Sequence, residues 1–289
     1  EHAPLIRCGA ATAGNDHRLG SSEAPPAIIS LYLGEQLSEI LEDISEEKHS
    51  CKKGNQFVKL GVSMLPQLPK DLTDRNRTSP IAFTGNKFEY RMVGSSQTVS
   101  IANIFLNTAM ASVLEEVADR LEKASDVDLE SHCIIKEFYQ NHKRIIFNGN
   151  GYDAAWEKEA EKRGLPNFRE TVSALPEMMS EKSLQLLASQ KVLSKGEVES
   201  RVEIALQTYS KQINIEAAIM VEMCRKYVIP SVSRYLGGLS ESITNQEAIG
   251  LEASEQRKIA TTLSATLNQS IAATEALHVS IAKALSYKD

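Results

Sequence analysis

The sequence has few of the features that define several large classes of protein. Its four cysteines, Cys8, Cys51, Cys133 and Cys224, lie far apart, which argues against a zinc knuckle or a small disulfide framework and favours a reducing compartment. No apolar run approaches the length of a membrane span, and no signal or transit pattern is present. The net charge of −6 argues against a general nucleic-acid binder. We therefore expect neither a membrane nor a nucleic acid as a partner.

The composition is that of an ordinary globular protein. Hydrophobic residues make up 42% and charged residues 24% of the 289 positions, which suits one large domain or two smaller ones. The chain begins with Glu1-His2-Ala3-Pro4 and not with methionine. We interpret it as a piece of a longer protein.

The first part of the chain is predicted to mix strands and helices. The pattern predicts the end of a helix at 4–13, a loop at 15–23, a buried strand at 27–30 and helices at 32–44, 100–123, 129–144 and 156–163. Gly85-Asn86 lies between two β-prone runs and predicts a two-residue hairpin, because glycine takes the positive φ that such a turn needs. The fold class that follows is α+β, with antiparallel strands and helices over residues 1–175.

Residues 176–289 are predicted to form a second region, a long helical hairpin or bundle. Ser194 and Glu197 have the spacing of a capping box that opens a long helix, and Pro230 is expected to end that helix. Gly237-Gly238 predicts the turn before a last helix at 244–287. The apolar stripes are wider than one partner helix requires, so we expect a neighbouring surface to cover the remainder.

The strand after the hairpin carries the strongest chemical pattern. Its side chains alternate, with Lys87, Glu89 and Arg91 on one face. The other face carries Phe88, Tyr90 and Met92. A carboxylate between two cations is suited to hold a metal beside a bound polyanion. The alternative is a half-solvated sheet whose charges form surface ion pairs.

Three further segments add to this pattern. Arg75 and Arg77 directly precede the hairpin, and Arg18 and Glu23 lie upstream in the stretch NDHRLGSSEAPPAII, residues 15–29. The stretch FNGNGY, residues 147–152, is suited to unusual backbone angles. A phosphate-binding turn is one interpretation of it, although it lacks the lysine and the strand–helix context of a P-loop.

These segments resemble the type III class of glutamine synthetases. The resemblance is carried in order by residues 15–29, by DRNRTSPIAFTGNKFEYRMVGS at residues 74–95, and by residues 147–167 with FNGNGY and EKRGLPN. It covers about the first 175 residues, and the remainder fits as a helical tail. The resemblance implies ligation of ammonia to glutamate, in which ATP phosphorylates the γ-carboxylate and ammonia then displaces phosphate. Such chemistry gathers negative charge in a small volume and needs metals and arginines around it.

The resemblance assigns three residues to glutamate and to its activated form. Arg18 matches the arginine on the glutamate α-carboxylate. Arg91 matches the arginine that holds the γ-carboxylate and the phosphoryl group moving onto it, a task suited to a guanidinium that binds planar oxyanions in two places. Glu23 matches the flap glutamate that covers the acyl phosphate and helps to deprotonate ammonium.

It assigns three others to ATP and its metal. Arg77 matches the arginine that stabilises the transferring phosphate, and Glu89 matches a ligand of the Mg²⁺ or Mn²⁺ between the ATP phosphates. Lys87 stands where type I enzymes carry an arginine facing ATP, and Ala82 stands where they carry another phosphate-binding arginine. Another residue must supply the charge that is missing at Ala82.

The resemblance also sets limits on the interpretation. The family's further metal ligands come from strands N-terminal to this chain, and none of its six histidines lies in a matching motif. We therefore expect the C-terminal part of the enzyme, inactive alone, in a ring-type homo-oligomer. A cytoplasmic location is expected, with an organellar one open. A related carboxylate–amine ligase and a non-catalytic helical assembly module are the alternatives.

Overall fold

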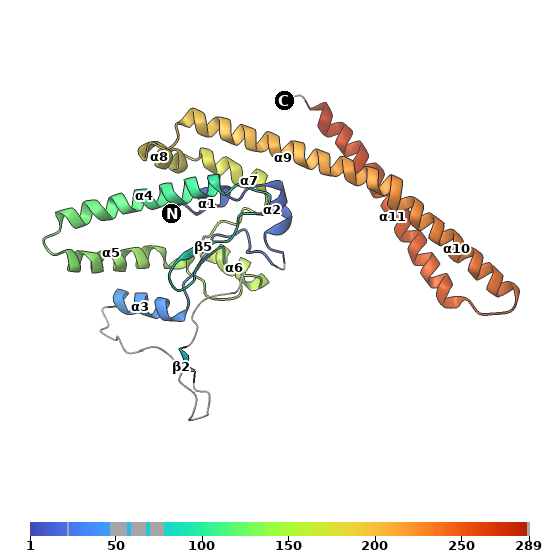
Figure 1. Cartoon of the computed structure of the whole chain (residues 1–289), viewed down its shortest axis with the longest axis horizontal. Helices are drawn as coiled ribbons and strands as arrows, with labels where there is room; N and C mark the ends of the chain where they lie inside the picture. The colour runs from blue at the N-terminus through green and yellow to red at the C-terminus, as the bar shows by residue number, and fades with distance from the viewer. Residues whose placement is uncertain (22, 47–56, 59–67, 70–77, 288–289) are drawn as a thin grey trace. The chain divides into compact units, whose positions relative to one another are not determined.

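The computed structural model describes residues 1–21, 23–46, 57–58, 68–69 and 78–287. The chain divides into two compact units, residues 1–206 and 207–289, which are described separately (Figure 1). The described residues are mostly helical with a small sheet, so the α+β expectation holds in part.

The sheet of the first unit has three short strands in the order β1-β4-β5. β5 (Phe88–Tyr90) runs antiparallel to β4 (Ile81–Phe83), as the hairpin predicts. β1 (Leu31–Tyr32) runs parallel to β4, so the expectation of antiparallel strands is wrong here. Local turn chemistry cannot reveal a parallel partner, because a crossover connection separates the two strands. A separate antiparallel pair joins β2 (Phe57–Val58) and β3 (Leu68–Pro69).

Two predictions near the start of the chain need correction. The strand expected at 27–30 is represented by a single bridge between Ile28 and Asn167, and the paired strand begins at Leu31. The loop expected at 15–23 begins inside a helix, α2 (Ala13–Arg18). Glycine and polar turn-forming residues favoured a loop, but a short helix of 6 residues fits between Thr12 and Leu19.

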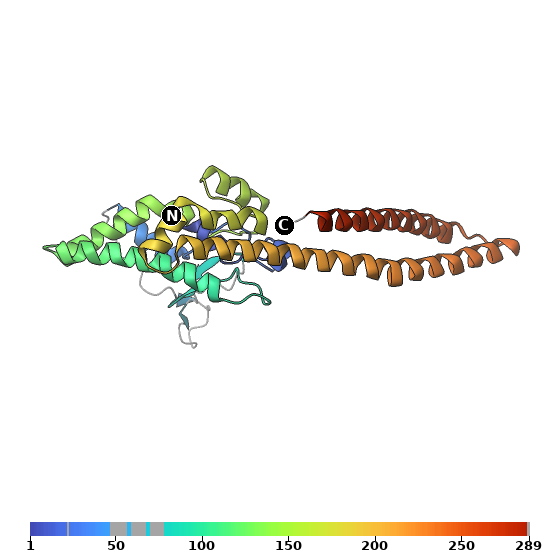
Figure 2. The same ribbon diagram turned by 90° about the horizontal axis from the view of Figure 1, so that it is seen from above.

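The helices expected at 32–44, 100–123, 129–144 and 156–163 are present, whereas the helix expected to continue to residue 13 ends at Cys8. The prediction of a helix over 100–123 is confirmed by α4 (Ser100–Lys123). Arg120 on α4 joins it to α5 by ion pairs with Glu130 at 2.8 Å and Glu137 at 2.7 Å, and the two helices lie side by side in both views (Figures 1 and 2). The others are α1 (Ala3–Cys8), α3 (Glu35–Ser45), α5 (Val127–His142), η1 (Lys143–Ile145), α6 (Ala154–Lys162), α7 (Thr171–Ala174), η2 (Leu175–Met179) and α8 (Glu181–Ser189).

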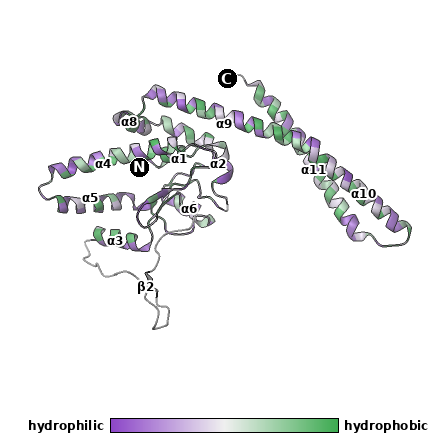
Figure 3. Cartoon of the chain, in the orientation of Figure 1, coloured by the Kyte–Doolittle hydropathy of each residue, from purple (hydrophilic) through white to green (hydrophobic). Residues whose placement is uncertain are grey.

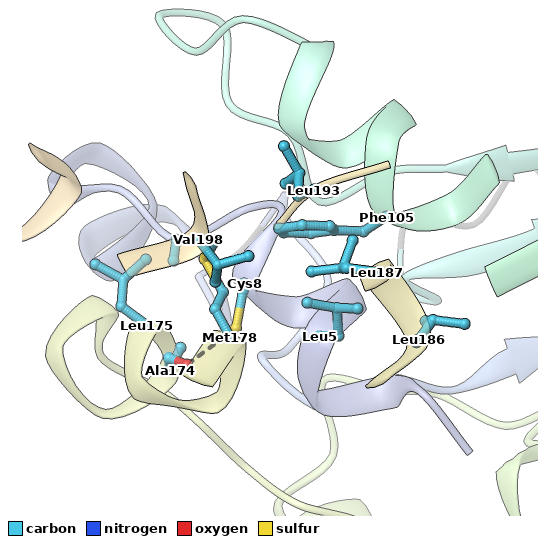
Figure 4. Close-up of a cluster of buried hydrophobic side chains, with 11 residues drawn as sticks. Leu5, Cys8, Phe105, Ala174, Leu175, Met178, Leu186, Leu187, Leu193 and Val198 are labelled. Atoms are coloured by element: carbon cyan, nitrogen blue, oxygen red, sulfur yellow. Dashed lines mark hydrogen bonds between the residues drawn. The ribbon is translucent and has the colours of Figure 1, made fainter. Parts of the chain in front are cut away.

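The main core of this unit is built around α1. Leu5 and Cys8 pack with Phe105 of α4 and Leu187 of α8 (Figure 4). The Cys8 thiol donates a hydrogen bond to the Ala174 carbonyl at 2.9 Å, and burial raises the pKa of this thiol to about 12. Helix α8 and the start of the next helix thus share a core with α1, while the boundary after residue 175 stays a prediction.

The long helix α9 (Lys195–Met223) opens as predicted. The Ser194 hydroxyl donates to Glu197 Oε2 at 2.7 Å, and the Glu197 N–H donates back to Ser194 Oγ at 3.4 Å. The predicted end at Pro230 is wrong. The wide π-type turn η3 (Cys224–Val228) leads directly into α10 (Ile229–Ala248), and Pro230 lies in the first turn of α10, where proline is tolerated.

The second unit forms the predicted helical hairpin with a different turn. Gly237 and Gly238 lie inside α10, so the turn expected there is wrong. The chain reverses at residues 249–253, where Gly250 has a φ of +80°, and continues as α11 (Ser254–Ser286). Arg225 of η3 pairs with Glu275 of α11 at 2.7 Å, so the hairpin extends past the start of α10.

Little of the second unit is buried by its own hairpin. In its described part, 207–287, the buried residues are Val221, Ile243, Ala253 and Thr274. Figure 3 shows hydrophobic residues distributed along α9, α10 and α11. Many of their apolar side chains are exposed, among them Ile215, Ile219, Met220, Tyr227, Tyr235, Ile259, Ile271, Val279 and Leu285. No described helix combines the length and apolar character that crossing a bilayer requires.

Candidate active site

The predicted two-residue hairpin between β4 and β5 is confirmed. The Thr84 N–H donates to the Lys87 carbonyl at 2.8 Å and closes the turn. Gly85, the first central residue, has a φ of +89°, whereas Asn86 is not among the described non-glycine residues with positive φ. This pattern is that of a type II′ turn, whose twist matches that of the strands it joins. The turn therefore fixes the register that pairs Glu89 with Ala82.

The Glu89 carboxylate lies between two cations on the same face of β5. Its Oε1 is 3.7 Å from Lys87 Nζ, and its Oε2 is 3.3 Å from Arg91 Nη2. The Thr84 hydroxyl lies 3.4 Å from Oε1. The predicted sharing of one face is confirmed. The Glu89 side chain keeps 39% of its area exposed, so a ligand can approach it from solvent.

The opposite face of the strand holds it against α1. Met92 is fully buried, and the Tyr90 hydroxyl donates to the Ile6 carbonyl at 2.9 Å. Burial raises the pKa of Tyr90. Phe88 differs, because it lies next to the turn, is 57% exposed and contacts the Phe83 ring at a centroid distance of 5.2 Å. The apolar face expected for this strand is therefore buried only away from the turn.

Arg18 connects the upstream cluster to this strand. Its guanidinium donates to the carbonyl oxygens of Met92 at 2.9 Å and Arg91 at 3.1 Å. A third hydrogen bond reaches Asn15 Oδ1 at 3.2 Å. Arg18 and Arg91 are far apart in the sequence, and the structure brings the Arg18 guanidinium to the main chain of Arg91.

Helix α2, which presents Arg18, is fixed at its other side. Asp16 Oδ1 accepts hydrogen bonds from the Thr171 N–H at 2.9 Å and the Thr171 hydroxyl at 2.7 Å. Behind it, the buried Arg7 donates to the carbonyls of Phe168 and Arg169. Burial lowers the pKa of the Arg7 guanidinium. These contacts join α1 and α2 to the segment that leads into α7.

The structure describes the predicted flap residue, Glu23, but not the predicted phosphate arginine, Arg77. Glu23 is exposed in a turn closed by the Ala24 N–H, which donates to the Ser21 carbonyl at 3.2 Å. The Gly20 N–H donates to the Pro25 carbonyl at 3.0 Å and joins the two ends of this loop. Arg77 lies outside the described residues, as does Arg75.

The 147–152 loop supports the edge of the sheet, a role that the sequence does not reveal. Asn148 Oδ1 accepts hydrogen bonds from the Leu33 and Gly34 N–H groups, both at 3.1 Å, at the start of α3. Gly151 packs against the chain entering β4, because a Cβ there would lie 2.4 Å from the Thr78 carbonyl oxygen. Neither contact leaves a signal in sequence spacing.

Aromatic rings also support the edge of the sheet at β1. Phe147 stacks on the buried Trp156 with ring centroids 3.7 Å apart. Arg163 lies 5.4 Å from the Trp156 ring and donates to the Ile146 carbonyl at 2.8 Å. Ile146 in turn forms a parallel bridge to Leu31 of β1. This packing fixes the strand beside β4.

The donor set at Glu89 fits one part of a metal site. A hard divalent cation takes six or more oxygen ligands. The part of the chain that the structure describes has no cluster of three or more histidine, cysteine, aspartate or glutamate side chains suited to a metal. Ala82, paired with Glu89, is buried and brings no charge. A cation at Glu89 would therefore take its other ligands from phosphate oxygens, from water or from groups outside the described histidine, cysteine, aspartate and glutamate side chains.

Comparisons with known proteins find relatives that share much of this sequence. The glutamine synthetase C-terminal domain family matches residues 130–247. A type-3 glutamine synthetase of Dictyostelium discoideum is 42% identical over 247 residues, which cover 84% of this chain and 34% of that protein. Glutamine synthetases of Butyrivibrio fibrisolvens and Bacteroides fragilis (strain YCH46) are 39% and 36% identical, over 86% and 85% of this chain and 36% and 35% of their own lengths. The chain thus spans about a third of the length of these relatives.

Proposed function

This chain belongs to the glutamine synthetase family, and we propose that it carries one side of an active site that ligates ammonia to glutamate. In this reaction the γ-phosphoryl group of ATP passes to an oxygen of the glutamate γ-carboxylate and gives γ-glutamyl phosphate and ADP. Ammonia then attacks the acyl carbon, phosphate leaves, and glutamine forms. The observation that carries the proposal is the position of Arg18 beside a strand on which Glu89 lies between Lys87 and Arg91.

The two arginines hold the two ends of glutamate in this proposal. Arg18 binds the α-carboxylate, and Arg91 binds the γ-carboxylate and then the phosphoryl group that joins it. A guanidinium suits both tasks because it donates two parallel hydrogen bonds to a planar oxyanion. The Arg18 guanidinium is held by the carbonyls of residues 91 and 92, so the distance between the two carboxylate sites is set by the main chain.

The remaining residues serve ATP and the acyl phosphate. Lys87, at the exposed end of the strand, and Arg77 donate to phosphate oxygens. Glu23, in its exposed loop, covers the acyl phosphate and takes a proton from ammonium. Glu89 would hold a Mg²⁺ or Mn²⁺ ion, which would neutralise part of the charge on the phosphates. In this structure the Glu89 carboxylate makes ion pairs with Lys87 and Arg91.

Assembly and location complete the proposal. The exposed apolar side chains of the second unit pack against another copy of the chain in a ring-type homo-oligomer, because large exposed apolar patches mark interaction surfaces. The protein acts in the cytoplasm, with glutamate, ammonia and ATP as its substrates.

The proposal is tested by assaying the full-length protein with glutamate, ATP and a series of amines. Ammonia is expected to give glutamine and ADP in equal amounts, with methylamine and larger amines much slower. A preference for a larger amine would instead identify a related carboxylate–amine ligase. No turnover of any amine by the folded full-length protein would favour an assembly module, in which the charged strand has no catalytic role.

A further inference from the structure

A buried amide lies directly behind Arg18. Asn15 is 1% exposed, and its Nδ2 donates to the carbonyl oxygens of Ala10 at 2.7 Å and Met92 at 3.0 Å. Because two carbonyls face the NH₂ group, the amide has one favourable orientation. Its Oδ1 is therefore directed at Arg18 Nη1, 3.2 Å away.

Gln97 holds this amide from the other side. Its Nε2 donates to the Gly9 carbonyl at 2.8 Å, at the end of α1. Its Oε1 then faces Asn15 Nδ2 at 3.3 Å. The order of contacts runs from the Gly9 carbonyl through Gln97 and Asn15 to Arg18, and each amide has its orientation set by a main-chain carbonyl.

The backbone at Gly94 adds an independent observation. A Cβ at this position would lie 2.9 Å from Asn15 Oδ1, closer than real Cβ atoms are found. Only glycine lets the chain leaving β5 pass this close to the amide oxygen. The exit from the strand and the Asn15 side chain are thus packed for one arrangement.

We propose that Asn15 and Gln97 are positioning residues for the glutamate site, which hold the Arg18 guanidinium in the orientation that meets the α-carboxylate. The inference rests on the proposed function, because that function assigns Arg18 to glutamate. An unrestrained arginine loses side-chain freedom when it binds a ligand, and that loss weakens binding. Asn15 restricts the Arg18 side chain before glutamate binds, so the binding step no longer includes this loss of side-chain entropy.

The test is a steady-state comparison in the full-length protein. Asn15→Ala removes the acceptor that orients Arg18 and is expected to raise the KM for glutamate roughly tenfold. The KM for ATP should stay within about twofold, because the uncharged amide does not reach the phosphate side of the site. Gln97→Met keeps the side-chain length, removes the amide oxygen and nitrogen, and is expected to raise the glutamate KM about threefold.

Thr171→Val is the matched control. It also removes a partly buried hydrogen bond that fixes α2, from the Thr171 hydroxyl to Asp16. Thr171 makes no described hydrogen bond to Arg18. We expect it to lower the melting temperature comparably and to leave the glutamate KM unchanged. A glutamate KM raised equally by Thr171→Val would mean that Asn15 acts through the general stability of α2, and the inference would be wrong.

A double-mutant comparison with Arg18→Lys separates this inference from the function on which it rests. If Asn15 acts through Arg18, then Asn15→Ala should have little further effect on the glutamate KM in the Arg18→Lys background. Additive effects would overturn the positioning role. An unchanged glutamate KM in Arg18→Lys alone would instead remove Arg18 from the proposed site. If Asn15→Ala does not fold, Gln97→Met answers the same question.

Discussion

The Arg18 guanidinium donates a hydrogen bond of 3.1 Å to the main-chain carbonyl of Arg91. The Arg91 side chain is the group proposed to hold the other end of the substrate. Two residues from separate segments are therefore joined through the backbone that carries one of them. A change that moves the end of β5 should affect both carboxylate sites together.

Glu89→Gln is expected to abolish glutamine formation in the full-length protein while leaving its melting temperature nearly unchanged. The substitution removes the negative charge that pairs with both Lys87 and Arg91, and loss of a metal ligand should cost several kcal/mol of transition-state stabilisation. The Glu89 side chain is partly exposed, so the cost to folding is small. Glu199→Gln, which breaks an exposed ion pair with Lys195 on α9, is the control. Retention of most of the wild-type turnover would remove Glu89 from the site.

The parts of this site that sequence predicts are those determined by neighbouring residues. Gly85 determines the hairpin because it alone of the two turn residues takes a positive φ. The alternation that brings Glu89 between Lys87 and Arg91 follows from strand geometry. The capping box at Ser194 and Glu197 is equally local, since both partners lie within one helical turn.

The parts that sequence does not predict depend on residues distant along the chain. The parallel pairing of β1 with β4 and the hydrogen bonds of Asn148 to the Leu33 and Gly34 N–H groups join segments with no common pattern. Pro230 was expected to stop a helix, but the wide turn of η3 before it accommodates the missing N–H. The motif identifies Arg18 as a candidate site residue. The roles of Asn15 and Gln97 follow only from their hydrogen bonds to each other and to Arg18 in the structure.

Gly151→Ala is expected to destabilise the first unit by about 1–3 kcal/mol, because the new methyl group would meet the Thr78 carbonyl oxygen at 2.4 Å. Main-chain atoms on both sides leave little room for relaxation. Gly196→Ala on α9 is the matched control, since a Cβ there meets nothing within 4 Å, and it should stabilise by about 0.5–1 kcal/mol. Urea unfolding measures both. Equal stabilities of the two variants would show that the loop does not press on the chain entering β4.

Alkaline pH is expected to weaken the fold through Cys8. Burial raises the pKa of this thiol from 9.0 to about 12, so the unfolded chain loses the proton first as the pH rises. The stabilisation of the folded state by the buried, protonated Cys8 thiol is fully present below about pH 9. It is lost towards pH 12, at about 1.4 kcal/mol per pH unit. Unfolding by urea across this range should show a shallower decline in Cys8→Ala. The exposed Cys133→Ala should decline as the wild type does, and an unchanged decline in Cys8→Ala would contradict the assignment.

The helical hairpin offers a test of assembly. Ile271 and Val279 on α11 are 42% and 59% exposed. Replacing both by glutamate should reduce the mass in solution and lower activity, because charges in an apolar contact are costly to bury. Gln269→Glu with Ser280→Glu, at exposed polar positions of the same helix, adds the same charge as a control. Light scattering measures the mass. An unchanged mass with normal activity would show that this face contacts no second copy.

The most direct test of the proposed chemistry follows an oxygen atom. Glutamate labelled with oxygen-18 in its γ-carboxylate is supplied to the full-length protein with ATP and ammonia, and the released phosphate is analysed by mass spectrometry. If the γ-carboxylate is phosphorylated and ammonia displaces phosphate, one phosphate is released for each glutamine formed. Each released phosphate carries one labelled oxygen. Glutamine formed with unlabelled phosphate, or ATP hydrolysed without glutamine, would contradict the account.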